Sequence, residues 1–262
     1  MQETAKHKIV IIGCGNVAWH LAKRLAGFKK YELFIYNHKA NSLLNDFKTK
    51  LKCSVIPNLS KIITDADLYF VCVADKNISS VARKIKVKNV QAIVIHTSGS
   101  AKINELGEKF NTAVFYPLQT FSKQDDVSWK EIPIIIEAKN TAIKTKILTL
   151  AKEFSNNVIS LKYKERLALH LAAVLVNNFT NALFVAAGDL VGKDKKILLP
   201  LIKQTILKIQ KMDPRLAQTG PAKRGDKNVM DKHLKLLSSN TELQNIYKQL
   251  SKLIVKQQTK HA

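Results

Sequence analysis

The residues with the clearest chemistry in this sequence form a glycine-rich turn near the amino terminus, Gly13-Cys14-Gly15-Asn16-Val17-Ala18. In a G-x-G-x-x-A turn between a strand and a helix, the first glycine permits the tight bend and the second lets the backbone approach a pyrophosphate. The free N–H groups and the dipole of the helix that follows favour the bound anion. We therefore predict a dinucleotide site; the alternative is a glycine-rich turn without a ligand. The predicted contacts are Gly13, Gly15, Asn16, Val17 and Ala18.

The second predicted strand ends in Tyr36-Asn37-His38-Lys39. An NAD enzyme usually carries an Asp or Glu at this point, which binds the ribose 2′-hydroxyl. Here an amide, an imidazole and an ammonium group stand instead, and none of them would repel a 2′-phosphate. We predict that Asn37, His38 and Lys39 bind NADP (as NADPH) and that NAD is the less favoured cofactor. An ordinary polar turn after the strand is the alternative.

Two further predicted strands end in small and polar residues. Val73 and Ala74 would let the chain pass under the cofactor, while Asp75 would cap the next helix. The other strand ends in the run from His96 to Ser100, in which Ser100 is a candidate helix cap. Because strand ends at a topological switch point form the ligand crevice, Ser98 and Gly99 are candidates for the nicotinamide or substrate side.

A strip of polar residues marks one face of a long apolar helix in the second half. It runs from Arg166 through His170 to Asn177, Asn178 and Asn181. Unpaired polar groups in a buried helix are costly, so the strip must find partners. One interpretation makes His170 a proton donor near neutral pH, with Asn177 and Asn178 orienting a substrate. The other is a structural hydrogen-bond network between helices or across a dimer.

A second candidate lies in the run from Thr219 to Asp226, where special backbone residues and charge occur together. This loop could close over a cleft and bind an anion through Lys223 and Arg224. The alternative is a turn followed by Asp226 acting as a helix cap. We name Arg224 among the candidate catalytic residues.

The elements that must position these residues alternate between short apolar runs and helical segments up to about residue 162. This alternation predicts parallel strands joined by crossover helices. After Tyr163 the strand signal stops, and Leu167–Ala187, Ile197–Met212 and Asp231–Gln257 are predicted as long helices. We predict an α/β Rossmann domain with a mostly parallel, doubly wound sheet over residues 1–162. An all-α domain for substrate binding and dimerisation follows over residues 163–262.

The amino-acid composition limits the classes of function that we expect. The 262 residues carry a net charge of +23, but only five of the 43 basic residues are Arg, and they are dispersed. Sequence-reading nucleic-acid sites favour Arg, and single-strand sites interleave aromatic residues with basic ones, so we expect a solvated Lys-rich surface and no nucleic-acid partner.

Three cysteines without metal-type spacing, and no secretory leader, indicate a cytoplasmic protein without a bound metal. The polar residues within Leu167–Ala187 argue against a membrane span, and we interpret this stretch as a buried helix.

Taken together, the quoted motifs resemble a bacterial Rossmann-like family that joins a dinucleotide-binding domain to a helical domain of unknown function. The resemblance rests on the Gly13–Ala18 turn, the Val73-Ala74-Asp75 and His96–Ser100 strand ends, Tyr116–Phe121, the His170…Asn177-Asn178-Phe179 helix and Thr219–Asp226. Members are usually assigned as NADP oxidoreductases. More distantly, the chain is similar to pyrroline-5-carboxylate reductases, deazaflavin-dependent NADP reductases and 6-phosphogluconate or 3-hydroxyisobutyrate dehydrogenases, whose helical domains commonly dimerise and complete the active site.

The sequence departs from the hydroxyacid dehydrogenases at one important point. Those enzymes carry a Lys followed four residues later by Asn on the central helix, whereas here Lys164 is followed by Ala168 and His170 by Val174. The resemblance therefore implies an NADP-dependent oxidoreductase and a homodimer, but not β-hydroxyacid oxidation. We expect hydride transfer between the nicotinamide and a small carbonyl or imine substrate. A non-catalytic NADP-binding sensor or regulatory protein is the alternative.

Overall fold

Eight strands in the described part of the chain form one sheet, in the order β3-β2-β1-β4-β5-β6-β7-β8. The structure is a computed structural model that describes residues 6–38 and 42–259. The strands are β1 His7–Ile12, β2 Tyr31–Tyr36, β3 Ser54–Ile56, β4 Leu68–Val71, β5 Ile93–His96, β6 Asn111–Pro117, β7 Ile134–Ala138 and β8 Val158–Ser160. Neighbouring strands run parallel, as in the β1–β2 pair of Ile9 with Leu33, except that β6 and β7 are antiparallel. The chain order reverses at β1–β4, which is the topological switch point of this sheet.

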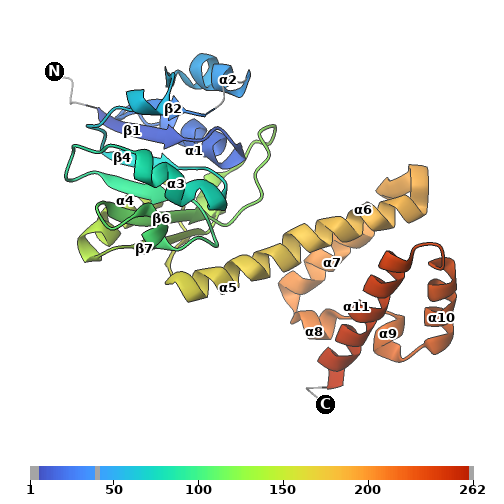
Figure 1. Ribbon diagram of the computed structural model, residues 1–262. Coiled ribbons are helices and arrows are strands. Elements are labelled where there is room, and N and C mark those ends of the chain that lie inside the picture. Colours follow the sequence, from blue (N-terminus) through green and yellow to red (C-terminus); the bar gives the residue numbers. More distant parts are fainter. Residues whose placement is uncertain (1–5, 39–41, 260–262) are drawn as a thin grey trace. The chain divides into compact units, whose positions relative to one another are not determined.

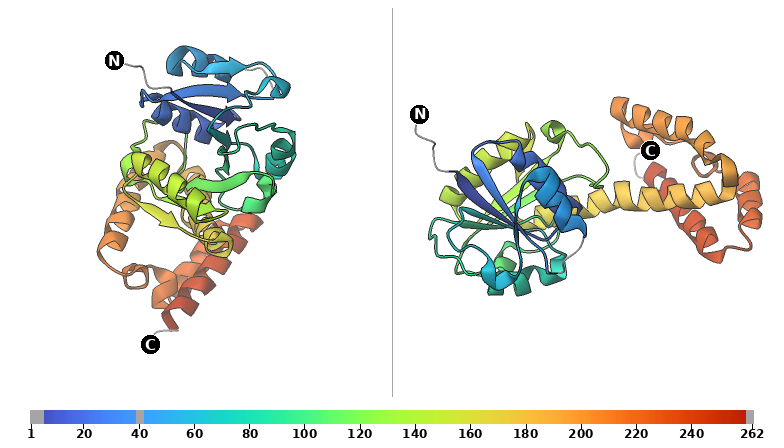
Figure 2. Two further views of the ribbon diagram at one scale, coloured as in Figure 1. Left: turned by 90° about the vertical axis from the view of Figure 1, so that its left-hand side faces the viewer. Right: turned by 90° about the horizontal axis from the view of Figure 1, so that it is seen from above.

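Helices cover both faces of this sheet, because its strands are apolar on both sides. The helices are α1 Asn16–Ala26, α2 Ser42–Leu51, α3 Ile78–Lys84 and α4 Thr141–Phe154, with short 3-10 turns η1 Leu59–Lys61, η2 Asp75–Asn77, η3 Ile103–Leu106 and η4 Trp129–Glu131. Ile9 and Ile11 of β1 face the core on one side, and Val10 and Ile12 face the core on the other. Figures 1 and 2 show α3 and α4 on opposite faces. The predicted doubly wound, mostly parallel Rossmann sheet is confirmed.

The region after β8 is helical, as predicted. It comprises α5 Tyr163–Ala173, the π-helical segment η5 Val174–Phe179, α6 Thr180–Val191, η6 Gly192–Leu198, α7 Leu199–Lys211, α8 Pro214–Ala217, α9 Pro221–Arg224, α10 Lys227–Leu236 and α11 Thr241–Thr259. The chain divides into two compact units, residues 1–177 and 178–262, so the first unit includes α5. The domain boundary at residue 162, drawn from sequence, stays a prediction.

Two predictions about the helices are corrected. The helix expected over 231–257 is interrupted, because the Asn240 side chain accepts a hydrogen bond from Leu243 N–H (3.0 Å) and starts a new helix at Thr241. The stretch Leu167–Ala187, expected to be buried, is largely exposed within this chain; Leu171 and Val185 are each 58 % exposed. Tyr163–Lys211 is the one helical stretch of the described residues that is long and apolar enough to cross a membrane, and 6 % of its most apolar window is buried.

Candidate active site

The turn after β1 has a backbone that only glycine can adopt. Gly13 has a φ of +106°, and its N–H donates to the Tyr36 carbonyl at 2.7 Å. A Cβ on Gly13 would lie 2.1 Å from the Cys72 carbonyl oxygen, so β4 passes directly against this turn. The turn therefore fixes the start of α1 against the ends of two neighbouring strands.

The amino-terminal end of α1 fits a pyrophosphate. Gly15 is the residue that precedes the helix, and a Cβ placed on it would meet no heavy atom within 4 Å. Among the described residues, no side chain caps this helix end, and its first turn holds no acidic residue. Open space in front of uncapped N–H groups is the arrangement in which helix ends bind phosphate.

Two adjoining hollows, of about 600 and 340 Å³, form a groove along the carboxyl ends of the strands. They share Gly15, Cys72 and Val73. The larger hollow is lined by Ile12, Gly13, Cys14, Gly15, Tyr36, Asn37, His38, Leu43, Cys72, Val73, Ala74, Asn77, Ser80 and Val81. The smaller is lined by Gly15, Asn16, Val17, Ala18, Cys72, Val73, Asp75, Thr97, Ser98, Gln119 and Phe121. The structure thus brings the predicted cofactor residues together, apart from Gly99, which is buried beside the groove, and Lys39, which lies outside the described residues.

The larger hollow has no carboxylate among the described residues that line it. Asn37 and His38 stand at its β2 end, as the sequence predicts. Asn77 and Ser80, which sequence reasoning missed, contribute an amide and a hydroxyl from η2 and α3. The sequence could have indicated these two residues, because they follow the end of β4, and that strand end borders the ligand crevice.

The wall of the smaller hollow is a turn, from Ser98 to Ala101, that follows β5. The Ser98 hydroxyl donates to the Asp75 carboxylate at 2.7 Å and accepts from the N–H groups of Ser100 (3.0 Å) and Ala101 (2.9 Å). The Ser100 hydroxyl also donates to Asp75. Neither Asp75 nor Ser100 is the helix cap that the sequence suggests, because both side chains are used in joining the end of β4 to this turn.

Beneath the same turn lies Arg166 of α5, which is fully buried. Its guanidinium donates to three backbone carbonyls, those of Ser98 (3.0 Å), Gly99 (2.9 Å) and Ala101 (2.8 Å). It also pairs with the Glu137 carboxylate of β7 at 2.9 Å. Five N–H donors in a planar fork suit this task, which a lysine cannot perform. Arg166, placed on the polar strip by sequence, is therefore the anchor of the groove wall.

One helical turn after Arg166, His170 reaches the end of β6. Its Nδ1 lies 3.1 Å from the Tyr116 hydroxyl, and the two rings meet edge to face with centroids 5.8 Å apart. A Cβ on Gly99 would lie 2.7 Å from His170 Nδ1 and 2.8 Å from Tyr116 Cζ. Gly99 thus leaves room for the two rings next to Ser98, the residue of this turn that lines the smaller hollow. Sequence reasoning missed Tyr116 as a site residue.

A second histidine nearby has a different state. His96, at the end of β5, is fully buried, and its Nδ1 accepts from the Ser98 N–H at 3.2 Å while no described group bonds Nε2. Burial, and next the charge of Arg166, lower the pKa of His96 to about 4. The imidazole is therefore neutral at pH 7.

The thiol of Cys72 borders both hollows of the groove. Burial raises its pKa to about 12, so it stays protonated and acts as a small apolar wall. None of the three cysteines forms a disulfide, and no group of three His, Cys, Asp or Glu side chains in the described ranges could hold a metal ion.

The other predicted catalytic residues are exposed, and none of them is among the described residues that line the groove. Asn177 ends the first unit, whereas Asn178 and Arg224 belong to the second, so their roles stay predictions. The run from Thr219 to Asp226 contains the short helix α9, and the Asp226 carboxylate accepts from the Val229 N–H at 3.1 Å. Asp226 is thus the helix cap that the alternative interpretation expects, while anion binding by Lys223 and Arg224 remains untested.

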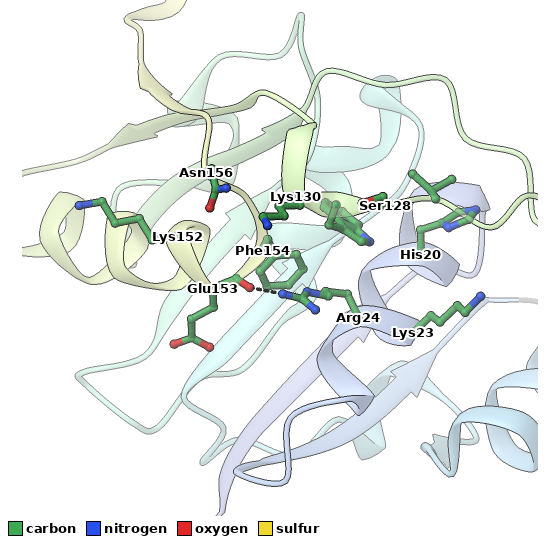
Figure 3. A pocket seen from close by; sticks show the side chains of 11 residues that line it. His20, Lys23, Arg24, Ser128, Lys130, Lys152, Glu153, Phe154 and Asn156 are labelled. Atoms are coloured by element: carbon green, nitrogen blue, oxygen red, sulfur yellow. Dashed lines mark hydrogen bonds between the residues drawn. The ribbon is translucent and has the colours of Figure 1, made fainter.

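A further hollow, of about 560 Å³, lies between α1 and the end of α4 and is shown in Figure 3. Arg24 lies on the Phe154 ring and donates to the Glu153 carbonyl, and so caps the carboxyl end of α4. His20 contacts the Ser122 carbonyl at 2.8 Å. These contacts give both side chains a structural role, and no residue of this hollow lines the groove.

Comparison with known proteins supports this description. Residues 8–100 match the family of coenzyme F420-dependent NADP oxidoreductases, and residues 132–254 match a domain of unknown function, DUF2520. A solved structure from Bacteroides fragilis, provisionally assigned as an NADP oxidoreductase, is 35 % identical, with a TM-score of 0.90 over 96 % of this chain and 98 % of that one. No curated protein matches the sequence.

Two more distant structures share the fold. A 1-pyrroline-5-carboxylate reductase from Streptococcus pyogenes is 15 % identical, with a TM-score of 0.60 over 95 % of this chain and 98 % of that one. An imine reductase from Myxococcus stipitatus, solved with NADP+, is 13 % identical, with a TM-score of 0.62 over 95 % and 92 %.

The fold and the matched domains place the chain among the NADP-binding oxidoreductases. More narrowly, it belongs to the family of the Bacteroides fragilis protein, which confirms the resemblance drawn from the motifs. Because that match covers 96 % of the chain, the apolar stretch Tyr163–Lys211 is part of this oxidoreductase fold.

Proposed function

We propose that the protein is a cytoplasmic NADPH-dependent reductase that acts on a small carbonyl or imine substrate. The observation that carries the proposal is the groove itself. It runs from a carboxylate-free end at Asn37 and His38, past the open Gly15 turn, to a wall at Ser98 that adjoins a hydrogen-bonded Tyr116–His170 pair. The lack of a disulfide among the three cysteines fits a reducing compartment.

Each part of the groove has a distinct task in this proposal. Asn37, His38 and Ser80 hold the 2′-phosphate end, and the α1 amino terminus holds the pyrophosphate. Bound NADPH supplies the hydride. The wall that Arg166 anchors orients the reacting end, and the residues beside it supply the proton that a reduced oxygen or nitrogen atom requires.

Replacing Asn37 with aspartate tests the cofactor assignment. Asn37→Asp adds a negative charge where the 2′-phosphate would bind, so we expect the ratio of NADH to NADPH dissociation constants to fall by about tenfold, or about 1.4 kcal/mol. Fluorescence titration measures both constants. Asn104→Asp makes the same charge change on an exposed residue of η3, outside both hollows, and should leave the ratio unchanged.

An unchanged ratio in Asn37→Asp would remove the basis for assigning NADP from the end of β2. Tight NADPH binding by the wild type, without oxidation by any carbonyl or imine compound, would favour the sensor over the reductase.

We also propose that the protein acts as a homodimer through its helical region. Among residues 178–258, the only buried apolar side chains are Ala222 and Leu237. Many large apolar side chains there are exposed, for example Val185 at 58 % and Leu201 at 66 %. Such surfaces are typical of subunit interfaces. A second copy of the same chain is the partner that is always present to cover this apolar surface. Sedimentation equilibrium should give a dimer at micromolar concentration; a monomer there would exclude this assignment.

A further inference from the structure

Tyr116 and His170 come from distant parts of the chain and meet at one point. Tyr116 lies near the end of β6, and His170 lies on α5. Both side chains are partly buried, and the Nδ1–hydroxyl distance of 3.1 Å is that of a hydrogen bond. Gly99, whose missing side chain leaves room for both rings, is next to Ser98 of the groove wall. The pair is therefore adjacent to the groove.

Arg166 fixes the helix that carries His170 to the groove wall. Arg166 precedes His170 by one turn of α5 and is bonded to the carbonyls of Ser98 and Gly99 and to the carboxylate of Glu137. This buried fork fixes α5, the groove wall and β7 against one another. The separation between His170 and the wall is thus set by a rigid network rather than by a loop.

We propose that Tyr116 is the proton donor of the reduction and that His170 returns the proton to it. This inference rests on the proposed reductase function. In the step, the Tyr116 O–H bond breaks as its proton passes to the oxygen or nitrogen of the substrate, which gains the hydride at carbon. The Nδ1–H bond of protonated His170 then breaks, and its proton restores the phenol. Solvent reprotonates the imidazole.

The surroundings keep the phenol protonated and make its anion costly. Burial raises the pKa of Tyr116, with Asp75 acting in the same direction and Arg166 opposing it, so the hydroxyl is neutral at pH 7. A tyrosinate left after proton transfer would be unfavourable in this site, which gives a reason for a proton source in direct contact. His170 is the group placed to return the proton, because its Nδ1 lies 3.1 Å from the Tyr116 hydroxyl.

The second unit contains a chemically matched control. The Tyr247 hydroxyl lies 2.9 Å from His233 Nδ1, with the rings edge to face at 5.7 Å, as in the Tyr116–His170 pair. Tyr247→Phe therefore removes the same kind of hydrogen bond within the second unit. Comparing Tyr116→Phe with Tyr247→Phe shows whether an effect is specific to the Tyr116–His170 hydrogen bond or follows the loss of any tyrosine–histidine hydrogen bond.

The first measurement needs no substrate. In 15N-labelled protein, imidazole NMR should show the His170 Nδ1 resonance and its titration midpoint shift in Tyr116→Phe and stay in place in Tyr247→Phe. Gly99→Ala should shift the same resonance, because a Cβ would lie 2.7 Å from Nδ1. A His170 resonance that is insensitive to Tyr116→Phe would overturn the proposal.

The second measurement follows NADPH oxidation with pyruvate, glyoxylate and 1-pyrroline as probes. Tyr116→Phe should lower kcat by about 100-fold or more with little change in KM for NADPH. His170→Gln should lower kcat by about tenfold, because the phenol must then recover its proton from solvent. Near-normal kcat in Tyr116→Phe would make His170 the direct donor and contradict the relay. Absence of wild-type oxidation with all three probes would count against the proposed function, while the NMR result would still decide whether the pair exists.

Discussion

Replacing Gly13 with alanine is expected to abolish tight NADPH binding and to destabilise the first unit. The new Cβ would lie 2.1 Å from the Cys72 carbonyl oxygen, at a φ of +106° that L-residues rarely adopt. Strain of this kind, with a backbone clash, costs about 2–4 kcal/mol. Because β4 must then move away from the turn, both hollows of the groove change shape, and NADPH affinity should fall by about 100-fold.

Urea unfolding and NADPH titration measure the two effects. Both tryptophans of the chain, Trp19 and Trp129, pack in the core of the first unit, so their fluorescence reports on this unit. Gly107→Ala is the matched control. Gly107 also has a positive φ, +84°, but a Cβ there would meet nothing within 4 Å. Gly107→Ala should cost only about 1–2 kcal/mol and leave NADPH affinity intact. Equal effects of the two substitutions would show that the contact with β4 does not shape the groove.

Replacing Arg166 with methionine is expected to be the most destabilising change of a charged residue in the first unit. The substitution removes the guanidinium donors from three backbone carbonyls, two of them buried, and leaves the Glu137 carboxylate, only 16 % exposed, without this partner. Breaking a buried ion pair from one side typically costs about 3–5 kcal/mol. Urea unfolding should show this loss, and the His170 imidazole resonance should move as α5 loosens from the groove wall.

Two further variants keep this prediction decisive. Arg83→Met removes an exposed arginine that bonds only Ser79, and should change stability by less than about 0.5 kcal/mol. The double variant Arg166→Met with Glu137→Leu removes the unpaired charge and should recover part of the loss. A cost below about 1 kcal/mol for Arg166→Met would mean that the network is not the anchor described.

The fold could be predicted from sequence because its signals are local. Continuous apolar runs such as Lys8–Ile12 identify strands covered on both faces, and the helix predicted to follow the glycine-rich turn begins at Asn16 in the structure. The glycine-rich turn is also recognisable in the sequence. Its sharp bend requires a positive φ, as at Gly13, and glycine is the residue that adopts a positive φ most readily. The break before Thr241 was readable too, because Asn240 is a standard residue for a helix start.

The proton-donor site could not be predicted in the same way, because its contacts are tertiary. Tyr116 and His170 are 54 residues apart, and Arg166 reaches the Ser98 carbonyl across 68 residues. Periodicity placed Arg166 and His170 on one helix face but gave no partner for either. The role of Asp75 was misread for the same reason, since its partners Ser98 and Ser100 follow a different strand.

The most direct test of the account is a crystal structure of the whole protein with NADP+ bound. We expect the 2′-phosphate against Asn37 and His38, the pyrophosphate at the Gly15 end of α1, and the nicotinamide ring at the Ser98 wall, on the side of Tyr116 and His170. A cofactor bound outside this groove, or a nicotinamide ring turned away from the Ser98 wall, would contradict the account.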